Sequence, residues 1–454
     1  MRIAWFTPFA LKSAIGDYSE AIVTVLSKYD DVTLFVPQSS DHGPIRDTDL
    51  PRESVPVDAS DDFLAKLASY DLLVYNMGNN LPFHLPIYQT AIRCPGIVIL
   101  HDVVMRDFFH GYFYQENYEL KGYPAYLRHA HGTEAERFGS DVITGKIAET
   151  IDEPQRLMYP LFQPILHGAL GVVVHSNYAR QRVVAEVATL TRTIDFPSFG
   201  PSRTISGLKT PQAGAPDGKV RILSFGVLNS NKLIHETISA IAGSEILRQY
   251  CQYDVIGRGT QDYEESLKQL IHQHRLESAI RLLGWQSDER LQAALLASDI
   301  VVNLRNPHLG ESSAVLVTSL LAGVATIVWD HGYYGEFPDD VVIKIHSETE
   351  IGKALERLVT EKETRTAYGE NARYHALNRF NTESYCVNLR EFAAEVLYQK
   401  PQLALADTVS KLLLEMGSSD EFDGLSGQFA GLIAGMSPVE ISLPQSERVE
   451  ELPV

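Results

Sequence analysis

The chain of 454 residues is longer than the size at which a single hydrophobic core stops growing, so we expect two domains. Its composition, 44% hydrophobic and 21% charged, is that of a folded globular protein and excludes a disordered or fibrous chain. The formal net charge of −19 repels phosphate backbones, which argues against nucleic acid as a partner, although it leaves contact with a membrane surface through a local basic patch open.

The first half of the chain alternates short apolar runs with helical stretches, which predicts β-α-β units and a mainly parallel sheet covered on both faces. The first apolar run is followed by a polar loop with Gly16, a helix over 18–26 and a second apolar run. The predicted strands of this Rossmann-like half are Ile3–Phe6, Val32–Val36, Leu72–Tyr75, Ile97–Leu100 and Val172–His175.

A segment rich in Pro, Gly and Ser over 194–219 marks the expected domain boundary, and the β-α alternation restarts after it. The second set of predicted strands is Val220–Phe225, Tyr253–Ile256, Ile280–Leu283, Ile300–Leu304 and Thr326–Trp329. We therefore expect an α/β protein with two Rossmann-like domains that face each other across a deep cleft. The predicted division is residues 1–200, residues 201–380, closing helices over 381–416 and an acidic tail over 417–454.

Ligands of open α/β folds bind at the carboxyl ends of the parallel strands, so the cleft is the expected binding site. Neither half carries a GxGxxG pattern with an acidic residue about 20 positions further on, which argues against a nicotinamide or flavin enzyme. The strand ending near Leu304 leads into a loop with Arg305 and Glu311 and then a helix that opens with Ser312 and Ser313. The amino terminus of such a helix suits a diphosphate, although an ordinary capped helix with a surface glutamate explains the same residues.

The order and spacing of these segments resemble those of the retaining GT-B glycosyltransferases of family 4, the glycosyl transferases group 1. The resemblance runs from Met1 to about Leu397. In the first half it is carried by GDYSEAIVTVL, LHDVV and VVVHSNYARQRV, and in the second by LSFGVLNSNKLIHETISAI, LLGWQSDERLQAALLASDIVV, the Glu311 segment and DHGYYGEFPDDV.

The resemblance implies roles for two residues of the first half. Gly16, at the first strand-to-helix turn, would let the backbone approach the donor phosphates where a Cβ would intrude. A turn glycine before a helix capped by Asp17 is the alternative. His101, at the end of a strand, would contact the transferred sugar near its reacting carbon, whereas a lone histidine is otherwise a structural residue.

In the second half, the resemblance places the ammonium of Lys232 on the diphosphate, where it would offset charge that grows as the sugar–phosphate bond breaks. A solvated lysine at a helix start is the alternative. Glu311 would accept hydrogen bonds from sugar hydroxyls beside the helix that begins with Ser312 and Ser313. Trp285 would lie beside the nucleotide base, or it packs between the domains.

Two positions depart from the common pattern of the family. Val227 stands where an arginine is usual, five residues before the lysine, and Thr318 stands where a second glutamate is usual. Arg305 is a plausible substitute for the missing cation, because a guanidinium can hold phosphate oxygens with two parallel hydrogen bonds. Its loop resembles an Arg-x-Pro-x-x-Gly-Glu-x-Ser variant of the family.

The expected reaction is transfer of a hexose from a UDP- or GDP-linked sugar, with retention at the anomeric carbon, to a saccharide or glycolipid. The sequence shows no DxD motif after a strand, so no metal is expected, and fixed charges would stabilise the leaving diphosphate. The aromatic-rich segment 105–163 is expected on the acceptor side, and a place of these aromatics in the core is the alternative. A nucleotide-sugar epimerase, a phosphorylase and a binding protein that has lost catalysis are the alternatives.

Cysteine usage bears on the compartment. Cys94, Cys251 and Cys386 are odd in number and widely spaced, which argues against disulfides and structural zinc and is typical of a reducing cytosol. The first residues lack the long apolar stretch of an export signal. We therefore expect a cytoplasmic protein, with the inner face of the membrane as an alternative place, and the sequence leaves the oligomeric state open.

Overall fold

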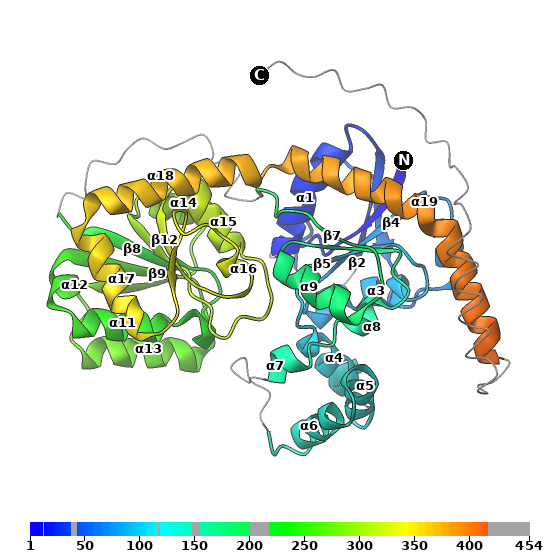
Figure 1. The fold of residues 1–454 in the computed structure, drawn as a ribbon, viewed down its shortest axis with the longest axis horizontal. Coiled ribbons are helices and arrows are strands. Elements are labelled where there is room, and N and C mark those ends of the chain that lie inside the picture. Colours follow the sequence, from blue (N-terminus) through cyan, green and yellow to red (C-terminus); the bar gives the residue numbers. More distant parts are fainter. Residues whose placement is uncertain (12, 38–42, 117–118, 148–154, 200–217, 416–454) are drawn as a thin grey trace.

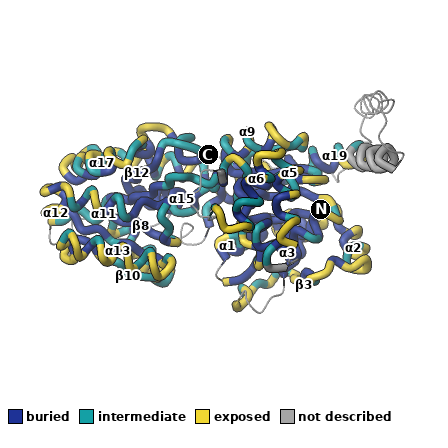
Figure 2. Tube along the Cα trace, turned by 90° about the horizontal axis from the view of Figure 1, so that it is seen from below, coloured by how far each residue is buried: buried dark blue, intermediate teal, exposed yellow. Residues whose placement is uncertain are grey.

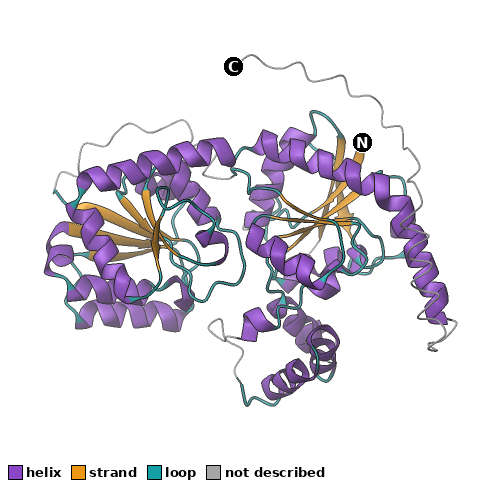
Figure 3. Ribbon diagram, viewed as in Figure 1, coloured by secondary structure: helices purple, strands orange, loops and turns teal. Residues whose placement is uncertain are grey.

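The computed structural model describes residues 1–11, 13–37, 43–116, 119–147, 155–199 and 218–415. Two parallel sheets, each flanked by helices, form two bodies that lie side by side (Figures 1 and 3). We call them the N-terminal and the C-terminal domain. Most of the predicted linker, 200–217, and the predicted tail over 417–454 lie outside the described residues.

The sheet of the N-terminal domain has seven strands in the order β3-β2-β1-β4-β5-β6-β7, and every pairing is parallel. The five strands predicted from apolar runs are confirmed, and the two short edge strands β3 and β7 were missed. The strands are β1 (Arg2–Phe6), β2 (Asp31–Pro37), β3 (Arg52–Val55), β4 (Leu72–Met77), β5 (Ile97–Leu100), β6 (Gly171–Val174) and β7 (Thr191–Thr193).

Helices cover both faces of this sheet, and a helical projection built from α4 to α7 extends beyond it (Figure 1). The helices are α1 (Ala14–Leu26), α2 (Asp61–Leu67), α3 (Leu81–Ala91), α4 (Arg106–Gly111), the π-helix η2 (Tyr112–Glu116), α5 (Gly122–His131), α6 (Thr133–Ile143), α7 (Gln155–Met158), α8 (Gln163–Leu166) and α9 (Asn177–Glu186).

The C-terminal domain repeats the design with six parallel strands in the order β10-β9-β8-β11-β12-β13. The strands are β8 (Val220–Phe225), β9 (Cys251–Ile256), β10 (Ile280–Gly284), β11 (Ile300–Val302), β12 (Ala325–Trp329) and β13 (Ile343–Ile345). The helices are the 3-10 helix η3 (Ser230–Lys232), α11 (Ile234–Gly243), α12 (Glu245–Tyr250), α13 (Gln261–Gln273), α14 (Asp288–Leu296), α15 (Ala314–Leu321), α16 (Gly332–Gly335), α17 (Thr349–Thr360) and α18 (Lys362–Arg379).

One long helix, α19 (Thr382–Glu415), leaves the C-terminal domain and packs on α1 of the N-terminal domain (Figure 1). The hydroxyls of Tyr18 and Tyr385 share a short hydrogen bond, and Arg390 Nε pairs with a carboxylate oxygen of Asp30 at 2.8 Å. The sequence predicted closing helices, in the plural, over 381–416; the structure has one continuous helix there, because α19 continues through Pro401.

Buried residues run through the centre of both domains (Figure 2). The core strands are apolar on both faces because helices cover both, and β4 is buried along its whole length. Within the described ranges, none of the helices combines the length and the apolar character that crossing a bilayer requires.

Candidate functional site

Two glycine turns shape the carboxyl edge of the C-terminal sheet, where β8 and β9 end. Gly226 has a φ of +98° and Gly257 a φ of +147°, backbone conformations that side chains rarely adopt. A Cβ on Gly257 would lie 1.9 Å from the carbonyl oxygen of Gly226. Only glycine therefore allows these two turns to pack against each other. We call this close-packed pair of backbone turns the base of the site.

Lys232 lies on this base with its ammonium buried. The residue is 6% exposed, Nζ donates to the carbonyl oxygen of Phe225 at 2.8 Å, and a Cβ on Gly226 would lie 2.8 Å from Nζ. Burial and, to a smaller extent, repulsion by the Arg305 guanidinium hold the pKa of the Lys232 ammonium well below its ordinary value, whereas the Glu311 carboxylate acts in the opposite direction. An anion bound beside Lys232 would reverse the shift and favour the charged form.

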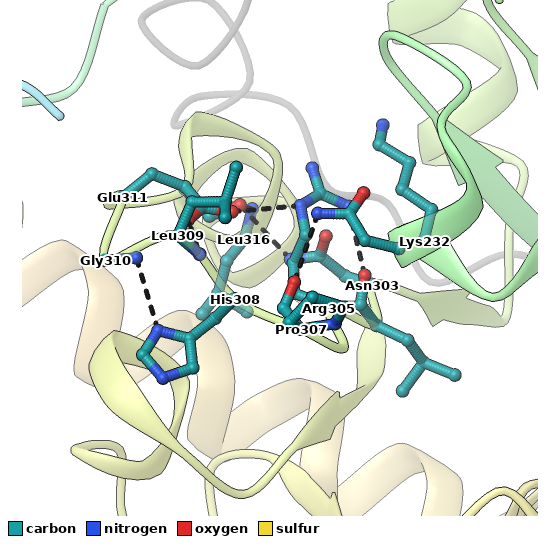
Figure 4. Close-up of polar contacts among 12 residues, drawn as sticks. Lys232, Asn303, Arg305, Pro307, His308, Leu309, Gly310, Glu311 and Leu316 are labelled. Atoms are coloured by element: carbon teal, nitrogen blue, oxygen red, sulfur yellow. Dashed lines mark hydrogen bonds and ion pairs between the residues drawn. The ribbon is translucent and has the colours of Figure 1, made fainter. Parts of the chain in front are cut away.

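The loop between β11 and α15 brings Arg305 and Glu311 together close to Lys232 (Figure 4). Arg305 Nε lies 3.3 Å from Glu311 Oε1, and Glu311 Oε2 accepts from the amide of Leu309 at 2.7 Å. Asn231, next to the lysine, holds the same loop, because its carbonyl oxygen accepts from the amide of Asn306 at 2.8 Å. The cation and the carboxylate thus belong to one hydrogen-bonded loop.

Helix α15 begins at this loop with its amino terminus toward Gly226 and Lys232. Ser313 caps the helix, since its Oγ accepts from the amide of Leu316 at 3.1 Å, and Asn303 Nδ2 donates to the same Oγ at 3.3 Å. A Cβ on Gly226 would lie 3.5 Å from Val315 Cγ2 in the first turn. That turn carries no acidic residue, so the positive end of the helix dipole adds to the two cations. Ser312 precedes the cap and is half-buried.

His101 follows β5 in the N-terminal domain and is oriented by Asn76. Asn76 Nδ2 donates to the carbonyl oxygen of Phe6 at 2.9 Å, which turns Oδ1 toward His101 Nε2 at 3.1 Å. Burial, His175 and His84 hold the pKa of His101 well below its ordinary value. The imidazole is therefore neutral, with the proton on Nε2 and a free electron pair on Nδ1.

The described contacts do not join Gly16 or Trp285 to the group around Lys232. Gly16 is in the first turn of α1, where its amide donates to Ser13 Oγ at 3.1 Å and a Cβ would lie 3.0 Å from both Pro8 O and Arg46 Nε. Packing within the domain thus leaves little room for a side chain at this position, and the contact of Gly16 with phosphate stays a prediction. Trp285 follows β10 and is 69% exposed, so its indole face is open to a ligand.

The carboxyl edges of the two sheets face each other. Gly310, with a φ of +77°, passes the N-terminal domain so closely that a Cβ would lie 2.9 Å from Val103 Cβ. Burial raises the pKa of Asp102, beside His101, to about 6, and Glu311 from the other domain adds to this shift. The predicted sugar contact His101 and the predicted phosphate loop therefore belong to two facing edges.

The two departures from the family pattern occupy different environments. Val227 is 67% exposed beside the glycine turn, whereas Thr318 is buried and its Oγ1 donates to the carbonyl oxygen of Ala314 at 2.7 Å. Thr318 therefore points back at its own helix and offers nothing to a ligand.

The aromatic residues of segment 105–163 are predicted on the acceptor side or, as the alternative, in the core. Phe108, Phe109 and Phe113 are buried in the hydrophobic core of the N-terminal domain, while Tyr112 and Tyr114 are half-buried and Tyr118 lies outside the described residues. The phenylalanines are thus core residues of the projection. Among the residues that the structure describes, no group of three histidine, cysteine or acidic side chains is placed to hold a metal ion.

Sequence reasoning missed two histidines behind the Arg305 loop. The rings of His308 and His331 lie 4.3 Å apart, and His308 Nδ1 accepts from the amide of Gly310 at 3.2 Å. Burial lowers the pKa of both to about 4, so they are neutral packing groups of the loop. His308 lies within the Arg-x-Pro-x-x-Gly-Glu-x-Ser loop, and His331 lies within the DHGYYGEFPDDV segment. Nothing in the spacing of these two segments indicates that the two histidines contact each other.

Comparisons with known proteins bear on the fold and on the class of protein. Residues 208–375 match the family model described as glycosyl transferases group 1, whereas curated protein sequences give no match. The solved complex of Anabaena HepE with UDP-glucose is similar, with a TM-score of 0.59 at 16% identity, and the match covers 87% of this chain and 100% of that chain. Sucrose-phosphate synthase of Thermosynechococcus elongatus is similar with a TM-score of 0.56 at 15% identity, covering 87% and 99% of the two chains.

WaaG, a glycosyltransferase involved in lipopolysaccharide biosynthesis, is similar with a TM-score of 0.52 at 16% identity, again covering 87% of this chain and 99% of that chain. The predicted GT-B fold is thus confirmed, and the family match supports the predicted class of nucleotide-sugar-dependent glycosyltransferase. The matched residues include Lys232, Trp285, Arg305, Glu311, Ser312 and Ser313.

Proposed function

We propose that this glycosyltransferase moves a hexose from a uridine-diphosphate sugar, with retention at the anomeric carbon, to a saccharide or glycolipid acceptor. The observation that carries the donor half is the buried ammonium of Lys232, which lies beside Arg305 and the amino terminus of α15. Two cations and a helix dipole that converge at one sheet edge suit a diphosphate. Similarity to a structure that contains UDP-glucose favours uridine over guanosine.

In the proposed donor complex, the diphosphate lies across Lys232 and the first turn of α15. Arg305 gives one of its nitrogens to the phosphate and keeps the pairing with Glu311 through another, since a guanidinium has five N–H donors. The exposed indole of Trp285 stacks on the base. Gly16 closes the phosphate end from the N-terminal domain, as the family resemblance implies.

At the sugar end, Glu311 accepts hydrogen bonds from hydroxyls of the transferred hexose, with Ser312 and Ser313 at the adjoining helix start. His101 approaches from the facing edge, and its neutral ring offers Nδ1 as an acceptor. The leaving diphosphate takes the proton of the acceptor hydroxyl on the same face, which preserves the anomeric configuration. Fixed charges stabilise the leaving group, so the reaction is proposed to proceed without a metal.

The acceptor is proposed to bind along the N-terminal domain, beside His101 and Asp102. A glycolipid acceptor would require contact with the inner face of a membrane, whereas a soluble saccharide would not, and both fit a cytoplasmic protein. A nucleotide-sugar epimerase or a phosphorylase would use the same donor contacts. A binding protein without catalysis is favoured by the absent arginine and second glutamate at Val227 and Thr318.

A nucleotide panel tests the donor half of the proposal. Melting temperatures of the full chain are measured with UDP, GDP, ADP and their sugar derivatives in excess, first with magnesium and then with a chelator. A ligand at 100 times its dissociation constant adds roughly 2.7 kcal/mol to stability, which raises the melting temperature measurably. Stabilisation by uridine nucleotides in chelator supports the proposal, and no shift with any nucleotide makes the non-catalytic alternative the better account.

Product analysis separates the enzymatic alternatives. With the stabilising nucleotide sugar and a mixed pool of saccharides and lipid extracts, a glycosylated product with retained configuration is expected. Release of a free sugar isomer would assign an epimerase, and release of a sugar phosphate in the presence of phosphate would assign a phosphorylase.

A further inference from the structure

Helix α9 of the N-terminal domain begins against a carboxylate of the C-terminal domain. Glu336, directly after α16, accepts from the amide of Tyr178 through Oε1 at 2.7 Å and from the amide of Asn177 through Oε2 at 3.1 Å. The third leading amide, that of Ala179, donates to Oγ of the cap Ser176 at 3.0 Å. The two domains thus share the capping of one helix.

The energetics favour this contact. The first amides of a helix have no partner within the helix, and its dipole places positive charge there. Helix α9 has ten residues and carries no acidic side chain in its first turn, so Glu336 supplies the only carboxylate that the described contacts give to this end. Hydrogen bonds to a charged acceptor are stronger than neutral ones.

The same end of α9 also touches the loop that carries Arg305 and Glu311. The rings of Tyr178 and His308 lie 4.9 Å apart at 78°, and a Cβ on Gly310 would lie 3.4 Å from Tyr178 Cε1. The ring of His308 in turn lies tilted against that of His331, which precedes α16, and Glu336 directly follows this helix. One residue of the N-terminal domain, Tyr178, therefore contacts both elements at once, through its amide and through its ring.

We propose that Glu336 is a positioning residue that clasps α9 and thereby holds the Arg305–Glu311 loop against the N-terminal domain in the arrangement competent for transfer. Separation of the domains breaks both Glu336 hydrogen bonds and the Tyr178–His308 contact together. Opening thus exposes the donor loop, and closing returns Glu311 to the edge that carries His101. The effect on transfer rests on the proposed function, whereas the clasp itself does not.

Glu336→Ala and the isosteric Glu336→Gln test the clasp in the full chain. The amide of Gln presents one acceptor and one donor to two backbone donors, so both variants lose pairing. Loss of charge-assisted bonds is expected to lower the closed-to-open ratio roughly tenfold or more. Hydrogen exchange of a peptide spanning Asn177 and Tyr178 should accelerate by the same factor, and small-angle scattering should report a larger radius of gyration.

Glu350→Gln is the matched control, because Glu350 accepts from the backbone amide of His346 at 2.9 Å within the C-terminal domain. It should leave exchange at α9 and the radius of gyration unchanged. The proposed clasp would be overturned if the Glu336 variants kept the hydrogen-exchange rate and the radius of gyration of the wild type. It would also be overturned if Glu350→Gln changed both quantities as the Glu336 variants do. Both measurements need no ligand, so they remain decisive even if no nucleotide binds.

The second half of the inference concerns transfer. Once a nucleotide sugar is identified by its stabilisation of the wild type, the Glu336 variants should bind it with a similar dissociation constant, since the donor contacts lie in the C-terminal domain. Turnover should fall about tenfold, and the hydrolysed fraction should rise because an open site admits water. An open variant with wild-type turnover and hydrolysis would overturn the link between the clasp and transfer.

Discussion

Replacement of Lys232 by methionine separates the role of its charge from that of its bulk. Met is similar in length and apolar, so it fills the space beside Gly226 while it removes the ammonium and its hydrogen bond to the Phe225 carbonyl. The lost hydrogen bond lowers stability, but loss of a desolvated cation near Arg305 raises it. We therefore expect the free energy of unfolding without ligand to change by no more than about 1–2 kcal/mol.

The effect on donor binding is expected to be larger. A hydrogen bond between charged partners contributes about 1.5–3 kcal/mol, so the dissociation constant of UDP should rise roughly 10- to 100-fold in Lys232→Met. At a UDP concentration that is 100 times the wild-type dissociation constant, the stabilisation should then fall from about 2.7 to roughly 0.4–1.4 kcal/mol. Thermal melts of both proteins with and without UDP measure this directly.

The depressed pKa of Lys232 adds a signature that a structural role would lack. In the empty site the pKa of the Lys232 ammonium lies well below its ordinary value, and a bound diphosphate raises it. Binding therefore takes up protons at pH values between these two pKa values and tightens as pH falls. Titration calorimetry with UDP-glucose in buffers of different ionisation enthalpy should show this uptake in the wild type and none in Lys232→Met.

Lys268→Met makes the same chemical change at an exposed position of the same domain, where Lys268 pairs with Glu265 at 3.4 Å. This variant should keep the full UDP stabilisation and the proton uptake. The reasoning is refuted if Lys232→Met binds UDP as the wild type does, or if it fails to fold while Lys268→Met is normal, because either result removes the distinction between charge and packing.

Three further outcomes follow from single residues. Gly257→Ala should lower the free energy of unfolding by several kcal/mol or prevent folding, because the new Cβ would lie 1.9 Å from a backbone oxygen. Denaturant unfolding at the wild-type midpoint would contradict the close approach of Gly257 to Gly226. Trp285→Ala should change stability by less than about 0.5 kcal/mol because the side chain is exposed, yet weaken UDP binding measurably in a titration; unchanged binding would rule out base stacking. Burial lowers the pKa of His175 to about 4 in the folded chain, whereas in the unfolded chain the imidazole protonates below about pH 6.5. Between pH 6.5 and 4 the free energy of unfolding of the wild type should therefore fall by roughly 1–3 kcal/mol more than that of His175→Gln. Parallel pH profiles of unfolding for the two proteins would contradict this.

The sequence predicted the central strands and the residues that follow them because both depend on local patterns. Buried parallel strands are continuous apolar runs, and side chains such as Lys232, Arg305 and Glu311 lie in the segments that come after such runs. The edge strands β3, β7 and β13 escaped prediction. All three are short and pair on one side only, and RESV and TRT are also polar. The roles proposed for these residues stay predictions.

Contacts that join distant parts of the chain had no sequence signal. Glu336 and the amides it accepts from are separated by 158 and 159 positions, and the carboxylate has no neighbouring residue type that announces a helix to cap. The burial of Lys232 depends on the left-handed turn at Gly226, which the letters FGV do not reveal. Gly16 was interpreted from family resemblance alone, and its packing against Pro8 and Arg46 appears only once the loops are placed.

The position of α19 has a consequence for the order in which the chain acquires its structure during synthesis. This helix follows the C-terminal domain along the chain, yet it packs on α1, where Tyr385 meets Tyr18 and Cys386 Sγ donates to the carbonyl oxygen of Ile22. A ribosome therefore releases almost all of both sheets before the surface of α1 is covered. We expect the N-terminal domain to stay incomplete until residues past 397 have emerged, so that a fragment ending before α19 would expose an apolar surface and aggregate.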